Sequence, residues 1–255
     1  MVEGQVEMEA VLQFLDETLG TSAFPDYDGA ANGLQVEGRR LVRRVGAAVD
    51  AGTLTIEAAV AGGVDLLLVH HGIFWEGLRP LTGRRYRRIE PLIRAGVALY
   101  SSHLPLDAHP ELGNAACLIR ALGHEPGDRF GHFREVPIGF TVEASGPREA
   151  FRDLVSRAVA GPVRLIPGGP PEVRRIGVVT GGGGGFIREA AEAGLDSLLT
   201  GEGAHHTFMD AHELGINVFY AGHYATETRG IRALAAHLAA TFGLPWEFLD
   251  FPSGL

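Results

Sequence analysis

Five residues of the types that bind divalent metal ions lie at places in the chain where side chains of an α/β fold gather. They are three histidines and two carboxylates: His70, His71, Asp107, His223 and Glu227. Imidazole and carboxylate without thiolate suit Zn, Mn, Fe, Co or Ni, and suit Mg less well because it prefers oxygen-only shells. Five ligands exceed the need of one catalytic zinc with an open position, but suit two ions about 3.5 to 4 Å apart. We therefore predict two divalent ions per chain, with Glu227 as the bridging carboxylate.

Taken singly, these residues also have ordinary structural explanations. His70 and His71 end an apolar run over residues 64–69, and adjacent histidines at such a place can be simple surface residues. A spacing of four puts His223 and Glu227 on one face at the start of a helix, where they could share an ion or only cap the helix.

Asp107 follows Pro105, which disfavours helix just before it, so we expect its carboxylate on a loop at a strand end. A lone loop aspartate is usually a turn former. What favours the metal interpretation is that all five residues occupy equivalent strand ends, where ligands of α/β folds bind.

Strands and helices alternate along the first half of the chain, after an amphipathic helix over residues 8–19. The expected strands cover residues 45–50, 64–69 and 97–101, and the expected helices cover residues 54–61, 84–94 and 111–122. This alternation predicts an α/β fold with mainly parallel sheets flanked by helices.

The second half repeats this order and some of the letters. The stretch RRVGAAVD from Arg43 resembles RRIGVVTG from Arg174, and an acid follows a histidine by four residues both at His103 and at His223. We infer an internal duplication into two related α/β units, over residues 1–127 and 128–255, with the metal site at their interface. The C-terminal helix could pack back on the first unit.

Further residues are candidates for catalysis or substrate binding. In the duplication Glu202 is the counterpart of His71, so it could act as a base or merely cap a loop, and His103 could orient ligands or substrate. The glycines of TGGGGG, from Thr180, separate a strand from a helix. Their backbone N–H groups could bind an anion, with Gly182, Gly183 and Gly184 as substrate contacts, or form only a tight turn.

Composition limits the function classes. The net charge of -9 opposes sequence-independent binding to nucleic acid or to anionic membranes. One cysteine, Cys117, allows no intrachain disulfide, and Glu3, Glu7 and Glu9 stand where a signal peptide would be basic. No apolar run reaches membrane-spanning length. We expect a cytoplasmic protein without a membrane partner.

Several motifs together resemble one family, the Ngg-interacting-factor-three-like proteins, also called GTP cyclohydrolase I type 2 homologues. They are NGLQVEG from Asn32, HHGIFW from His70, HLPLDAHPELGN from His103, LLTGE to Glu202 and GHYATE to Glu227. The resemblance implies a dinuclear metal centre with the five ligands named above and a toroidal homohexamer with the sites facing its interior. Some family members carry a domain inserted mid-chain; this chain has only a short connection there, so functions tied to that insertion are not carried over.

Two functional classes remain. The first is a metal-dependent hydrolase acting on a small-molecule nucleotide or phosphoester. We favour it because an open two-metal site without thiolates is poorly suited to stabilising a fold. The second is a ring-forming metal-binding scaffold or regulator. A basic cluster from Arg84 to Arg88 is usually a solvated face, but inside a pore it would favour a nucleic-acid-binding form of the second class.

Overall fold

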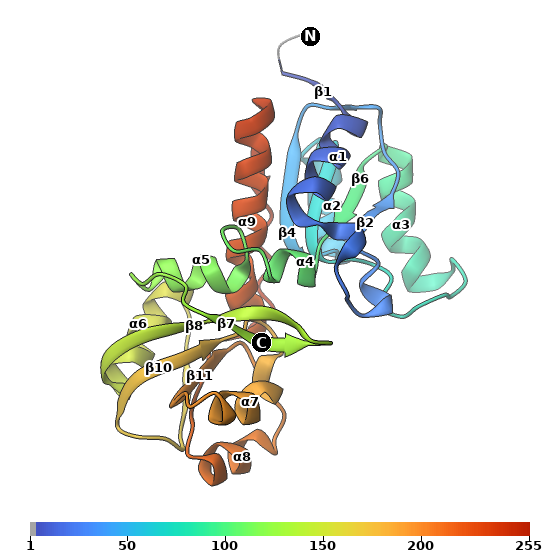
Figure 1. Cartoon of the computed structure of the whole chain (residues 1–255). Coiled ribbons are helices and arrows are strands. Elements are labelled where there is room, and N and C mark those ends of the chain that lie inside the picture. The colour runs from blue at the N-terminus through green and yellow to red at the C-terminus, as the bar shows by residue number, and fades with distance from the viewer. Residues whose placement is uncertain (1–3) are drawn as a thin grey trace. The chain divides into compact units, whose positions relative to one another are not determined.

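The computed structural model describes residues 4–255 in two compact units. One unit comprises the chain up to Leu106 together with Ile231–Phe251, and the other comprises Asp107–Gly230 and Pro252–Leu255. Figure 1 shows the elements of each unit. Glu3, one of the acidic residues used above, lies outside the described residues.

The first unit contains a five-stranded sheet in the order β13-β4-β5-β6-β2. Its strands in that order are Trp246–Phe248, Val45–Asp50, Leu66–His71, Ala98–Ser101 and Gly33–Val36. Neighbouring strands are parallel except β2, which pairs antiparallel with β6. A separate antiparallel ribbon joins β1 (Val6–Glu7) to β3 (Leu41–Val42).

The helices of this unit cover its sheet. They are α1 (Met8–Leu19), α2 (Thr53–Ala61), α3 (Gly83–Ala95) and the last part of α9 (His223–Phe242), with short 3-10 turns η1 (Thr21–Ala23) and η2 (Asp28–Ala30) and the short helix α4 (Leu104–Asp107) at the end of the first segment.

Both faces of this sheet are buried, which explains the continuous apolar letters of its central strands. Alternate residues of β5, Leu67 and Val69, join a core with Ile56 of α2 and Leu92 of α3. Tyr100 of β6 instead donates its hydroxyl to Asp16 of α1 (2.7 Å). Helices α1 and α9 pack together, and the ring centroids of Phe14 and Phe242 lie 5.3 Å apart.

The second unit contains a six-stranded sheet in the order β7-β8-β10-β11-β12-β9. Its strands in that order are Arg129–Phe133, Val136–Pro147, Glu172–Val178, Ser197–Thr200, Asn217–Tyr220 and Arg164–Pro167. Its helices are α5 (Asn114–Ala121), α6 (Arg148–Val159), α7 (Ile187–Glu192), α8 (Thr207–Leu214) and the start of α9, with a 3-10 turn η3 (Gly183–Phe186). Figure 1 shows α5 and α6 on a different side of this sheet from α7 and α8.

The sheet of the second unit is mixed, not mainly parallel as predicted. Only β10-β11 and β11-β12 are parallel pairs, and β7, β8 and β9 pair antiparallel with their neighbours. The prediction missed this because β7 and β8 form a hairpin, whose strands are necessarily antiparallel. The first sheet is mainly parallel, as predicted.

A parallel β-α-β-α-β order is common to both units, over β4 to β6 and over β10 to β12. In each unit an aspartate side chain accepts a hydrogen bond from the backbone N–H of an arginine. Asp65 accepts from the N–H of Arg43 (2.9 Å), and Asp196 accepts from the N–H of Arg174 (2.8 Å). The two pairs are matched by the sequence repeat. This equivalence supports a duplication.

The compact units divide at other residues than the predicted boundary at 127/128. Helix α5 lies before that boundary, yet its residues Leu118 and Ile119 share a core with Phe140 of β8. The chain therefore enters the second unit at Asp107, and the end of α9 returns to the first.

Two local predictions also need correction. Asp107 ends the short helix α4 and does not lie on a loop, because Pro105 falls in the first turn of this helix, where proline is tolerated. Strand β5 extends through His70 and His71, two residues that we expected just beyond it.

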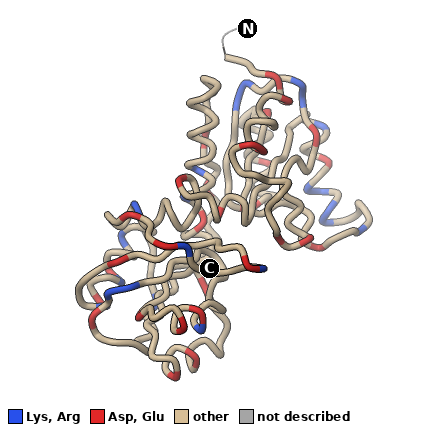
Figure 2. The backbone as a smooth tube through the Cα atoms, viewed as in Figure 1, with Lys and Arg blue, Asp and Glu red and all other residues tan. Residues whose placement is uncertain are grey.

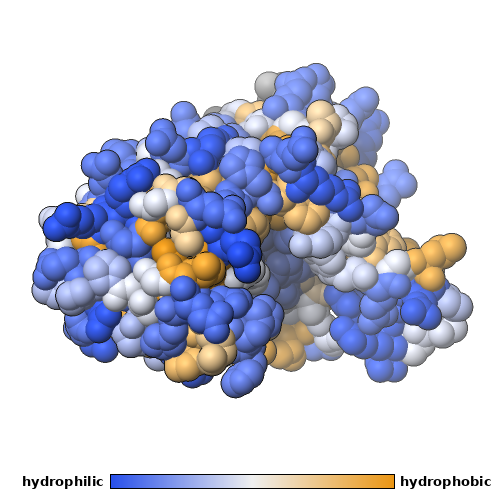
Figure 3. All heavy atoms as spheres, turned by 60° about the horizontal axis from the view of Figure 1, so that its bottom comes forward, coloured by the Kyte–Doolittle hydropathy of each residue, from blue (hydrophilic) through white to orange (hydrophobic). Residues whose placement is uncertain are grey.

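The surface carries acidic residues in both units, and basic residues gather at the start of α3 (Figure 2). Hydrophilic residues cover most of the face in Figure 3, with hydrophobic residues in separate patches. None of the helices over residues 4–255 is both long enough and apolar enough to span a membrane.

Candidate metal centre

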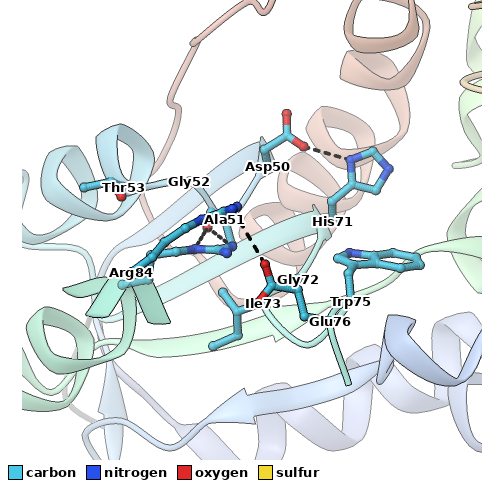
Figure 4. Close-up of a pocket in the computed structure, with 11 residues that line it drawn as sticks. Asp50, Ala51, Gly52, Thr53, His71, Gly72, Ile73, Trp75, Glu76 and Arg84 are labelled. Carbon is cyan, nitrogen blue, oxygen red and sulfur yellow. Dashed lines mark hydrogen bonds and ion pairs between the residues drawn. The ribbon is translucent and has the colours of Figure 1, made fainter. Parts of the chain in front are cut away.

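Three histidines of the first unit meet at the carboxyl ends of two neighbouring parallel strands. His70 and His71 end β5, and His103 follows β6. Each offers one ring nitrogen, and these three atoms all lie within 4.8 Å of one another. Figure 4 shows His71 beside Asp50 and Trp75. His103, which we expected around the ligands, is thus placed as a ligand could be.

The Nδ1 atom of each of these histidines faces an oxygen that can only accept. His70 Nδ1 lies 2.9 Å from the carbonyl oxygen of Ser102, His71 Nδ1 lies 2.9 Å from Asp50, and His103 Nδ1 lies 2.9 Å from Asp26. Nδ1 must therefore carry the proton, which leaves the lone pair of each neutral ring on Nε2. Metal-binding histidines are commonly oriented in this way.

Asp26 organises the loop that carries His103. Its carboxylate also accepts from the N–H of Leu104 (3.0 Å) and from the side chain of Asn32 (2.8 Å). Asn32 in turn accepts from the N–H of His103 (2.8 Å). Burial raises the pKa of Asp26, but the hydrogen bond and charge of His103, with Asn32 and the N–H of Tyr27, lower it on balance.

Gln35 fixes the loop after His71 in a similar way. Its side-chain oxygen accepts from the N–H of Ile73 (2.8 Å), and its nitrogen donates to the carbonyl oxygen of Ala30 (2.9 Å). A Cβ atom at Gly72 would overlap the Gln35 amide. The roles of Asp26, Asn32 and Gln35 were not predicted from the sequence, although the last two lie in the NGLQVEG motif.

In the second unit, His223 and Glu227 lie one turn apart at the start of α9. His223 Nε2 is 3.2 Å from the buried carboxylate of Glu227, and His223 Nδ1 is 2.8 Å from Glu202. Burial lowers the pKa of His223, but hydrogen bonds and charge from Glu227 and then Glu202 raise it to about 9. Glu202 is engaged in orienting His223, which favours a positioning role over that of a base.

Asp107 is buried and held by two side chains of its own unit. It accepts from Asn114 (2.8 Å) and from Thr180 (3.3 Å). Asn114 is itself fully buried and also accepts from the N–H of Gly230 (2.7 Å). The carboxylate is therefore fixed in orientation, as a metal ligand should be.

The loop of residues 180–185, the glycine loop, contains the five consecutive glycines and lies directly against Glu227. A Cβ atom at Gly181 would sit 3.0 Å from Cδ of Glu227 and closer still to its Oε1, and 3.2 Å from His223 Nε2. The φ angle of +62° also favours glycine there. The loop is held by Thr226, which accepts from the N–H of Gly181 (3.0 Å).

Two of the three predicted substrate contacts in this loop use their N–H groups inside the protein. Gly183 donates to Thr200 (3.0 Å), and Gly184 donates to the carbonyl oxygen of Glu202 (3.0 Å). These two groups are engaged in this conformation, which favours the tight turn over the anion site. Gly182 remains a predicted contact.

The predicted ligands thus fall into two sets, one in each unit. The first unit brings together His70 and His71, with His103, which was not predicted as a ligand, beside them. The second brings together His223 and Glu227, with Asp107 fixed separately. That the sets form one centre stays a prediction.

Comparison with known proteins supports the family resemblance of the motifs that contain these residues. The profile of the family described as Duf34/NIF3 (NGG1p interacting factor 3) matches residues 6–252. This chain belongs to that family. A Duf34/NIF3 relative from Deinococcus radiodurans, named GTP cyclohydrolase 1 type 2 homolog, is 45% identical and is aligned over 99% of this chain and 96% of its own length. The protein of the same name from Pyrococcus horikoshii is 42% identical, over 98% and 100%.

Solved structures show the same fold over the whole length. Protein ybgI, described as of unknown function, is 35% identical with a TM-score of 0.91, over 98% of this chain and 100% of that one. The protein TTHA1606 from Thermus thermophilus is 42% identical with a TM-score of 0.89, over the same shares. The Duf34/NIF3 fold is therefore established for this chain. Its histidine cluster, formed by His70, His71 and His103, suggests metal binding.

Proposed function

We propose that this chain is a metal-dependent hydrolase that acts on a nucleotide or phosphoester. Two divalent ions would be held by His70, His71, Asp107, His223 and Glu227. The observation that supports this most directly is the orientation of His70, His71 and His223. Nδ1 of His70 faces the carbonyl oxygen of Ser102, and Nδ1 of the other two rings faces a carboxylate.

The chemistry of the donors fits divalent metals. All are imidazoles or carboxylates, which suits Zn, Mn, Fe, Co or Ni. Gly181 supports the assignment of Glu227, because any side chain there would displace its carboxylate. When bound, such ions would polarise the substrate and lower the pKa of a coordinated water.

His103 and Asp26 form the pair that we assign to proton transfer. The Asp26 carboxylate holds Nδ1 of His103 (2.9 Å), so Nε2 can accept or return a proton, as in other His–Asp pairs. Glu202 keeps His223 oriented. Trp75 stands edge-on to His103, with ring centroids 4.9 Å apart, and limits the orientations of that ring.

Metal content tests this proposal. We expect close to two ions per chain by elemental analysis of protein isolated without chelator. Glu227→Ala should lower both occupancies because a bridging group serves both ions, and His70→Ala should lower one more than the other. His212→Ala, at an exposed histidine, is the matched control. Full metal content in Glu227→Ala protein would refute the assignment.

Self-association into a hexamer is a separate proposal, and it would also suit the scaffold alternative. Large apolar side chains are exposed in the segment before and within α3: Trp75, Leu78, Leu81 and Tyr86. Exposed apolar groups mark a protein interface where they form one contiguous patch, and the hexamer proposal takes these four residues to do so. Light scattering that gives a monomer across micromolar concentrations would refute the hexamer.

Metal-replete protein without turnover in a nucleotide and phosphoester screen would favour the scaffold.

A further inference from the structure

Arg88 is a half-buried cation that hydrogen-bonds to a backbone carbonyl and not to a carboxylate. Its Nε and Nη2 donate to the carbonyl oxygen of Ala51 at 3.0 and 2.6 Å. In the described part of the chain it makes no other hydrogen bond, although the charges of Glu76 and Asp50 act on it. Burial, and then the charge of Arg84, lower the pKa of Arg88. Buried charges are normally paired, so an arginine with spare donors is suited to an anion that arrives from outside.

Arg88 lines a pocket of about 360 Å³ beside the histidine cluster. The pocket is also lined by Arg84, His71, Trp75 and the carboxylates Asp50 and Glu76, and Figure 4 shows how these residues surround it. Both carboxylates are already engaged, Asp50 with His71 at 2.9 Å and Glu76 with Arg84 at 3.6 Å. The side chain of Glu76 is 59% exposed, so it can yield its place to a ligand.

The arginines of α3 divide into different roles. Arg84 and Arg88 are four residues apart and share one face of the helix. Arg85 instead donates to the carbonyl oxygens of Gly77 and Arg79, at 2.9 and 3.2 Å. Arg87 is exposed and does not line the pocket. The basic cluster is therefore not simply a solvated face.

We propose that Arg84 and Arg88 bind a phosphate group of a small phosphorylated substrate in this pocket. Two guanidinium groups offer several N–H donors in planar arrays, which match the edges of a tetrahedral oxyanion. The position beside His71 would then direct the rest of the molecule to the histidine cluster. That last step rests on the proposed hydrolase function, whereas phosphate binding itself does not.

The test uses Trp75 as a reporter in metal-free protein. The chain has two tryptophans, so Trp246→Phe leaves Trp75 as the only one. Inorganic pyrophosphate should change its fluorescence saturably. Arg84→Ala and Arg88→Ala should each weaken binding by about 10-fold or more, the usual effect of losing a charge-assisted hydrogen bond. Arg87→Ala, on the same helix, should bind as the parent does.

The proposal would be overturned by no saturable binding at millimolar pyrophosphate, by equal binding of acetate, or by full binding in Arg84→Ala protein. Because Arg88 also holds Ala51, the exposed Arg84 gives the decisive variant if Arg88→Ala does not fold. A single-stranded oligonucleotide that binds at these arginines while pyrophosphate does not would also refute a small-molecule site. Metal content, measured in parallel, tests the hydrolase proposal independently.

Discussion

Gly181→Ala should impair metal binding without unfolding the protein. The new Cβ would lie 3.0 Å from Cδ of Glu227 and nearer still to Oε1, inside van der Waals contact. Glu227 is 2% exposed, so its carboxylate has no open space into which to retreat. It must leave the position from which it faces His223.

The magnitude has two parts that a control can separate. A residue with a side chain at φ +62° costs about 1 kcal/mol in the left-handed region, which is roughly 2–4 °C in Tm for a chain of this size. Gly215 has a φ of +70° with open space around it, so Gly215→Ala carries only this backbone cost. Displacement of the carboxylate adds to Gly181→Ala an expected loss of about 10- to 100-fold in metal affinity.

Isothermal titration of metal-free protein with Mn or Zn measures the affinity, and thermal unfolding in chelator measures the backbone cost. In chelator Gly215→Ala should lose only the Tm that corresponds to the backbone cost, and Gly181→Ala should lose more because it also displaces the buried carboxylate. Only Gly181→Ala should lose affinity. Unchanged affinity in Gly181→Ala protein, or an equal loss in Gly215→Ala protein, would refute the role of Glu227.

Three further predictions address other parts of the molecule. Asn114→Ala removes a fully buried donor to Asp107 and should lower the free energy of unfolding by about 1–3 kcal/mol, measured by denaturant titration in chelator. Burial raises the pKa of Glu189, but hydrogen bonds from the N–H and ring of His132 lower it on balance. The stabilisation by Glu189 should therefore be present above its ordinary pKa of 4.5 and be lost as pH falls through the lower folded value; a Tm difference from Glu189→Gln that persists in acid would contradict this. Hydrolysis, if measured, should vanish with chelator, return with Mn, Zn or Co, and survive Cys117→Ala, because burial raises the pKa of that thiol and so disfavours the reactive thiolate.

Much of the histidine cluster was predictable because strand ends can be read from the sequence. An apolar run that stops at His70 and His71 marks the carboxyl end of a buried strand, and parallel neighbours end at the same edge. The helical spacing of His223 and Glu227 likewise placed both on one face of α9. These inferences need only local periodicity.

The partners that orient the histidines could not be predicted in this way. Asp26 lies 77 residues from His103 in the sequence, and Gln35 lies 38 residues from Ile73. Both lie in or beside a turn-rich segment with no periodicity, where residue types indicate turns and not contacts. The antiparallel strands of the second sheet were missed for a different reason, because β7 and β8 form a hairpin that was not predicted from the sequence.

The internal repeat explains why the two units offer similar but unequal chemistry. His103 and His223 are matched by the repeat, and each follows a central parallel strand and donates from Nδ1 to a carboxylate. The carboxylates have different origins: Asp26 lies in the N-terminal loops, whereas Glu202 takes the place that His71 has in the first unit. One unit thus has a histidine where the other has an acid, so exchanging the two should not be neutral. His71→Glu should lower metal content, because the carboxylate would face Asp50 and lose the hydrogen bond that now orients the ring.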